Sequence, residues 1–103
     1  MIKVTVLYPN APDASFDMKY YVTHHMPMVR DRCGPACRNI AAESGFAGRE
    51  PGSSAPYIAV GHLTFDSLAA FQQSFGPNAA EIVADTPRYT NTKPIIQMGE
   101  ITL

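Results

Sequence analysis

The sequence lacks an excess of basic residues, since 8 Lys and Arg stand against 9 Asp and Glu and the net charge is -1. Such a chain has no basic surface to attract phosphate backbones or anionic lipids, so we expect neither nucleic acid nor a membrane as a partner. It also lacks any apolar run near the roughly 18 residues of a membrane span. The opening "MIKVTVLYPN" alternates instead of forming the hydrophobic stretch of a signal peptide. We therefore expect a cytoplasmic protein.

Motifs that would hold a metal or a cofactor are also missing. Cys33 and Cys37 are the only cysteines, and their C-x-x-x-C spacing matches neither a redox C-x-x-C motif nor a zinc site, so we expect two free thiols. The histidines form no H-x-H or H-x-x-x-H pattern. A phosphate-binding G-x-G-x-x-G loop and a G-x-S-x-G nucleophile motif are absent as well. We expect no metal and no cofactor.

Hydrophobic periodicity predicts the element order β-α-β-β-α-β. Alternating apolar residues indicate strands, and apolar residues three and four positions apart indicate helices. The predicted strands cover 2–8, 38–46, 57–65 and 95–103, while one helix begins near 16, a second covers 68–75 and a short one follows through 78–84. This order is typical of a single α+β domain, residues 1–103, with a ferredoxin-like fold. Its four-stranded antiparallel sheet carries both helices on one face.

The ends of the predicted helices follow from capping residues and proline. Asp13 and Ser15 are candidate N-caps for the first helix, and Asn78 resembles the start of a capping box for the short helix. Pro27 lacks an N–H and disfavours helical geometry at the residue before it, so the first helix should end or kink near His25. A resumption of the helix through "MVRDRC" is the open alternative.

The strand predicted at 57–65 is apolar on both faces. Its alternating side chains are Tyr57, Ala59, Leu63 and Phe65 on one face and Ile58, Val60 and His62 on the other. Helices cover only one face of such a sheet, and each Å² of apolar surface left in water forgoes about 25 cal/mol. We expect a second copy of the chain to cover the other face, giving a homodimer with two-fold symmetry.

Three stretches together resemble the EthD family, which is named for ethyl tert-butyl ether degradation and lies within the dimeric α+β barrel superfamily. They are "FDMKYYVTHHMP" at 16–27, "VGHLTFDSLAAF" at 60–71 and "ADTPRYTNTKPIIQMGEI" at 84–101. The resemblance implies a dimeric α+β barrel and a catabolic role of the oxidoreductase type. The wider superfamily includes cofactor-free monooxygenases, lactone isomerases, polyketide cyclases and haem enzymes, and fold alone does not choose among them.

His25 is the leading candidate for catalysis. An imidazole with an ordinary pKa of about 6.5 can take up and return a proton near neutral pH, and a position beside a kink aims the ring into a cleft. Tyr21, one turn earlier, is placed to orient that ring or to donate to a developing oxyanion. The alternative is that His25 caps helix carbonyls. We expect Phe16 and Tyr20 to pack and His24 to be solvated, because adjacent helical residues point about 100° apart.

Four further residues are candidates for the site. His62 is either a core histidine with satisfied nitrogens or a second catalytic residue lining the cavity of His25. Asp85, Tyr89 and Asn91 lie in a polar segment that can supply substrate contacts, although the same residues suit turn formation.

These residues predict a small cofactor-independent enzyme that acts on a hydrophobic, enolisable or phenolic small molecule. His25 is the expected general base, and Tyr21, His62 or Asn91 is expected to stabilise the anion. The alternative is a dimer without catalytic activity that binds a hydrophobic ligand or supports a separate oxygenase in ether degradation. A domain that only dimerises is the third interpretation, and it predicts no cavity.

Overall fold

A four-stranded antiparallel sheet forms the frame of the protein. A computed structural model describes residues 1–103. The strands are β1 (Ile2–Pro9), β2 (Cys37–Ser44), β3 (Tyr57–Phe65) and β4 (Ile95–Glu100). Their order across the sheet is β2-β3-β1-β4, and each neighbouring pair is antiparallel. The two central strands are therefore the first and third in the chain, as the ferredoxin-like arrangement requires.

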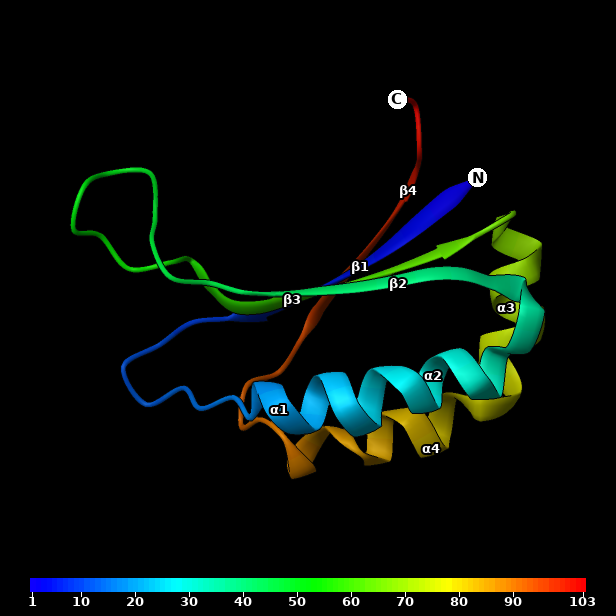
Figure 1. The fold of residues 1–103 in the computed structure, drawn as a ribbon, viewed down its shortest axis with the longest axis horizontal. Coiled ribbons are helices and arrows are strands. Elements are labelled where there is room, and N and C mark those ends of the chain that lie inside the picture. The colour runs from blue at the N-terminus through cyan, green and yellow to red at the C-terminus, as the bar shows by residue number, and fades with distance from the viewer.

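All helices lie on one face of this sheet, and the opposite face carries no covering element (Figure 1). The first helical segment, residues 18–36, consists of α1 (Met18–Tyr20), a π-helical stretch (Tyr21–His25), α2 (Met26–Cys33) and a 3₁₀ turn (Gly34–Ala36). The second comprises α3 (Leu68–Phe75), a 3₁₀ turn (Gly76–Asn78), α4 (Ala79–Ala84) and a 3₁₀ turn (Thr86–Arg88). The predicted α+β, ferredoxin-like fold is confirmed. None of these helices combines the length and apolar composition needed to cross a bilayer.

Pro27 does not break the first helix, contrary to the leading expectation. It lies in the first turn of α2, where its missing N–H is tolerated. Immediately before it, the N–H of Met26 bonds to the carbonyl of Tyr21, five residues back, which is the π-helical spacing. The shift in hydrogen-bond register thus carries the helix past the proline.

The predicted caps of two helices are wrong. Asp17, and neither Asp13 nor Ser15, caps the first helix, because its Oδ1 accepts from the N–H of Tyr20 at 3.0 Å. Asn78 forms no cap, since its side-chain amide donates instead to the carbonyl of Ser74. Several polar residues precede the first helix, and only the path of the chain selects Asp17 among them. No side chain caps α4.

The core fills the space between the sheet and the helices. On β3, Ala59, Leu63 and Phe65 alternate toward the helices and are almost completely buried. The thiols of Cys33 and Cys37 belong to the same core, and they are unpaired. Burial raises the pKa of both thiols, so they remain protonated and act as small apolar groups.

Gly61 allows the first helical segment to approach the sheet closely. A Cβ atom at this position would collide with the hydroxyl oxygen and ring of Tyr21. The absence of a side chain at the middle of β3 therefore leaves the space that the phenol of Tyr21 occupies.

Replacing Gly61 with alanine should displace Tyr21 and lower the free energy of unfolding by about 1–3 kcal/mol, the usual cost of overpacking a core. Chemical denaturation followed by circular dichroism measures the change. Gly76→Ala is the control, because a Cβ atom there meets only open space and the backbone is right-handed helical. If the two variants have equal stability, the contact between Gly61 and Tyr21 does not constrain the fold.

Candidate functional site

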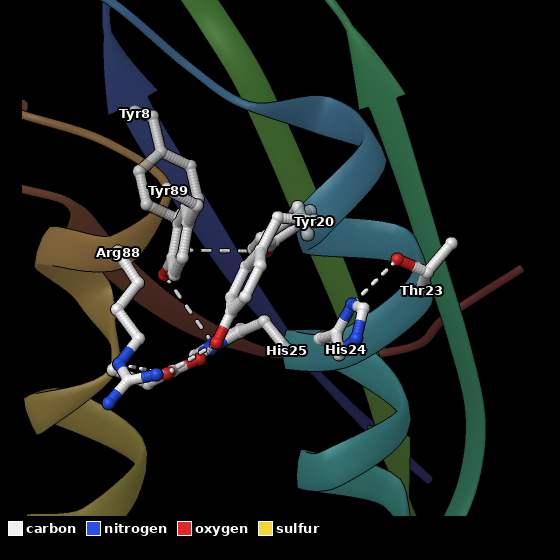
Figure 2. Close-up of polar contacts among 9 residues, drawn as sticks. Tyr8, Tyr20, Thr23, His24, His25, Arg88 and Tyr89 are labelled. Atoms are coloured by element: carbon white, nitrogen blue, oxygen red, sulfur yellow. Dashed lines mark hydrogen bonds and ion pairs between the residues drawn. The ribbon is translucent and has the colours of Figure 1, made fainter.

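The π-helical segment brings Tyr21 and His25 to the same side of the first helix. Their rings stack at a centroid distance of 5.4 Å and an interplanar angle of 13°, and both residues are buried, with 1% and 5% of their surface exposed. His24 is exposed and points away, toward the hydroxyl of Thr23 (Figure 2). The structure therefore places the adjacent histidines as expected, with only His25 facing the interior.

A carboxylate fixes the orientation of the His25 ring. Asp85, which ends α4, brings its Oδ2 to 2.9 Å from Nδ1 of His25. An ionised carboxylate only accepts hydrogen bonds, so Nδ1 carries the proton and Nε2 presents its lone pair. The other oxygen of Asp85 accepts from the hydroxyl of Tyr20 at 2.8 Å and lies 3.6 Å from Nε of Arg88. Both oxygens of the carboxylate are thus engaged.

Three tyrosine hydroxyls extend this arrangement beyond Nε2. The Tyr89 hydroxyl lies 3.4 Å from Nε2 of His25 and 2.8 Å from the Tyr8 hydroxyl. The Tyr8 hydroxyl donates to that of Tyr21 at 3.4 Å. A phenol has one proton, so this pattern makes Tyr89 donate to Tyr8 in the short contact. Nε2 then has no donor of its own and is free to accept a proton.

Burial sets the protonation states of these groups. It lowers the pKa of His25 below its ordinary value and outweighs the opposing hydrogen bond and charge of Asp85. Burial acts to raise the pKa of Asp85, but the hydrogen bonds from His25 and Tyr20 outweigh it and leave that pKa low. Burial also raises the pKa of the Tyr8, Tyr21 and Tyr89 hydroxyls. At neutral pH the site holds a neutral imidazole, a carboxylate and protonated phenols.

These groups line a small cavity between the helices and the sheet. Its volume is about 70 Å³, and 11 of its 14 lining residues are hydrophobic. Its polar groups include the imidazole of His25 and the hydroxyls of Tyr8, Tyr21 and Tyr89, three tyrosines that are counted among the hydrophobic residues. An apolar cavity with a few convergent polar groups and a perturbed histidine has the usual composition of a small-molecule site. It can present the base Nε2 of His25 and the free hydroxyl proton of Tyr21 to the same ligand.

His62 does not share this cavity, because it lies on the opposite face of the sheet. Its neighbours Gly61 and Leu63 face the helices, and the alternation of side chains turns His62 the other way. There its Nε2 lies 3.2 Å from Oε1 of Glu43, while its buried Nδ1 has no hydrogen-bond partner. The structure therefore separates the two predicted catalytic histidines.

The polar segment before β4 divides between two roles. Asp85 and Tyr89 lie beside His25, although Asp85 holds the imidazole instead of facing a ligand. Asn91 braces the chain, since its Oδ1 accepts from the N–H of Ser15 and its Nδ2 donates to the carbonyl of Asp13, both at 2.9 Å. Asn91 therefore has a structural role, as the turn-forming alternative suggested, but it bonds to residues 13 and 15 and not to its own turn.

Tyr8 and the hydroxyl of Tyr20 are parts of the site that sequence reasoning missed. Tyr8 fits the alternation of β1 as a core residue, and its packing gave no indication of a polar role. Its position in a buried strand could have indicated that role, because the hydroxyl of a buried tyrosine needs a hydrogen-bond partner. No group of three His, Cys, Asp or Glu side chains lies close enough together to hold a metal ion.

Comparison with known proteins places the chain in a family. Residues 11–93 match the model described as the EthD domain. The chain belongs to the EthD family. An EthD-like protein from Ralstonia eutropha JMP134 shares 37% sequence identity with it, at a TM-score of 0.95, and the match covers 99% of this chain and 92% of that one. No curated protein matches the sequence.

More distant solved structures share the fold of this EthD chain. An ethyl tert-butyl ether degradation family protein from Bacillus halodurans C-125 has 17% identity and a TM-score of 0.67, with 99% of each chain covered. A dimeric ferredoxin-like protein of unknown function from Thermobifida fusca YX has 14% identity and a TM-score of 0.64, covering 97% of this chain and 90% of that one. At these identities the likeness concerns the fold alone.

The pKa of His25 should lie below its ordinary value of 6.5, and Asp85→Asn should lower it further by removing the carboxylate that favours the imidazolium. NMR titration of the imidazole carbon-bound protons measures both. A pKa above 6.5 in the unmodified protein would show that attraction to Asp85 outweighs burial.

The lowered pKa of His25 should also make the free energy of unfolding depend on pH. The unfolded chain takes up the proton of His25 first as the pH falls, so this contribution to stability is present above pH 6.5 and is lost as the pH falls through the folded-state pKa. His25→Gln, which cannot titrate, should lose less stability than the unmodified protein as the pH falls from about 7 to 5.

Proposed function

We propose that the protein is a cofactor-independent enzyme that uses His25 as a general base on a hydrophobic small molecule. The contact of Nδ1 with Asp85 is the observation that carries the proposal, because it leaves Nε2 unprotonated and directed at the cavity. A carboxylate in this position holds the productive tautomer and stabilises the imidazolium that forms. Membership of the EthD family supports a role in catabolism without specifying the reaction.

The chemistry of the site suits removal of a proton from an acidic C–H or O–H bond. Nε2 of His25 takes the proton, the bonding electron pair stays on the substrate as an enolate or phenolate, and a tyrosine hydroxyl donates to the anionic oxygen. Tyr21 is that donor, because Tyr89 donates its proton to Tyr8 and Tyr8 donates to Tyr21, whose own proton is not engaged. Return of the proton to another atom completes an isomerisation. An oxidation would begin with the same deprotonation and then need an oxidant such as dioxygen.

We propose further that the protein is a homodimer whose sheets pack face to face. The bare face of the sheet carries a row formed by Ile95, Leu7 and Val60, which are paired across β4, β1 and β3. Leu7 and Val60 are only half-buried in the single chain, and Ile95 is 53% exposed. Structural neighbours with the same fold are described as dimeric. A second copy would remove this apolar row from water.

Sedimentation velocity should show a dimer for the unmodified protein and a folded monomer for Val60→Lys, because a charge in the middle of the row is costly to bury. Val22→Lys is the matched control, since Val22 is exposed on the helical side of the molecule. A monomeric unmodified protein, or a Val60→Lys variant that stays dimeric, would contradict the proposed interface.

Screening against lactones, quinols and aromatic polyketides tests the activity. For a compound that is turned over, His25→Ala should reduce kcat by about 10² to 10⁴, the usual contribution of a general base. His24→Ala is the matched control, because the neighbouring imidazole is exposed and lies outside the cavity. The acid limb of kcat/KM should fall with an apparent pKa below 6.5, as expected for the buried His25.

Two results would count against the enzyme. Turnover unchanged in His25→Ala would remove the assigned base. A ligand that binds in the cavity but is recovered unaltered, with an affinity that does not depend on the protonation of His25, would favour the alternative of a ligand-binding or accessory protein.

A further inference from the structure

The cavity beside His25 lies next to a larger groove on the surface. Val83, Thr86, Pro94 and Ile96 line both the cavity and the groove. These residues come from α4, the turn after it and the start of β4. The groove has a volume of about 600 Å³. The shared residues place the groove directly beside the cavity that Nε2 faces.

The inner cavity is too small to hold a whole substrate. An engineered cavity of about 150 Å³ binds benzene, whereas this one measures about 70 Å³. Typical small-molecule sites enclose roughly 300–1,000 Å³, which is the range of the groove. A substrate whose reacting group lies at His25 must therefore place the rest of its structure in the groove.

The groove carries a single charge. Lys93 is the only charged residue among those that line it. Lys93 is exposed, and no ion pair in the structure includes it. Neither of the two acidic residues nearest to Lys93 in sequence, Asp85 and Glu100, lines the groove. Asp85 is also engaged by His25, Tyr20 and Arg88. The electrostatic field in the groove is thus positive and uncompensated by a neighbouring side chain.

We propose that the substrate is an amphipathic anion. Its apolar body lies along Val83, Pro94 and Ile96, its carboxylate or comparable anionic group pairs with Lys93, and its reacting group enters the cavity at His25. The position of the reacting group rests on the proposed function, whereas the pairing with Lys93 depends only on the charge and shape of the groove. Lys93 is accordingly a specificity-determining residue that does not touch the reacting atoms.

Two fluorescent probes of nearly the same shape test the assignment. Anilinonaphthalene sulfonate is a hydrophobic anion, and phenylnaphthylamine is its uncharged counterpart. Lys93→Met should weaken sulfonate binding about two- to fivefold, the range of one solvent-exposed ion pair, and should leave binding of the uncharged probe unchanged. Lys93→Arg should retain the sulfonate affinity, and added salt should weaken sulfonate binding by the unmodified protein.

Two control variants test whether the probes bind in the groove. Lys19→Met removes an exposed lysine of α1 that does not line the groove, and it should change neither affinity. Ile96→Trp places a larger side chain where Ile96 lines both the cavity and the groove, and it should weaken the binding of both probes.

The proposal is overturned if Lys93→Met weakens both probes equally or neither, or if Ile96→Trp weakens neither. Repeating the measurement in His25→Ala separates this result from the assignment of the base. Charge discrimination that persists in His25→Ala supports the anion site whatever the outcome for catalysis. If His25→Ala abolishes turnover but Lys93→Met does not distinguish the two probes, His25 remains the assigned base and the proposed anion site is wrong.

Discussion

The hydrogen bond between Asp85 and His25 is the interaction on which the site depends. An imidazole enclosed by aromatic rings loses its hydration, and burial alone would leave its tautomer undetermined and its protonated form costly. The carboxylate, 2.9 Å from Nδ1, resolves both problems by accepting a hydrogen bond from Nδ1–H and by compensating the positive charge when Nε2 is protonated. Tyr20 and Arg88 hold the carboxylate in turn. A buried histidine without this partner would be a packing residue.

Two features of the backbone make that contact possible. In the π-helical segment from Tyr21 to His25, both rings lie on the side of the helix that faces the sheet, where they stack. Gly61 then leaves room for the phenol of Tyr21 against β3. The aromatic rings of Tyr8, Tyr21, Tyr89 and Phe16 pack mostly edge-on or tilted between these two layers. The hydroxyls of the three tyrosines consequently form a chain of contacts that starts at Nε2 and runs from Tyr89 through Tyr8 to Tyr21.

Sequence patterns were most informative where they depend on neighbouring residues. The alternation along β1 and β3 and the helical spacing after Ser67 predict the elements and their order, because these periods follow from local backbone geometry. The same patterns do not show which of several polar residues caps a helix, so Asp17 was missed. They show that His62 and Leu63 face opposite ways but not which face the helices cover, so they left open whether His62 is a core histidine or lines the cavity of His25.

By itself, the sequence determined the element order, the family and the choice of His25 over His24, because periodicity and helical angle are properties of short segments. Only the tertiary structure decided that Asp85 pairs with His25 across 60 positions of the chain, that Tyr8 joins Tyr89 across 81, and that Asn91 braces a loop. Such contacts depend on how the layers pack against one another. Contacts between residues far apart in the chain produce no periodic pattern in the sequence, so the sequence alone does not predict them.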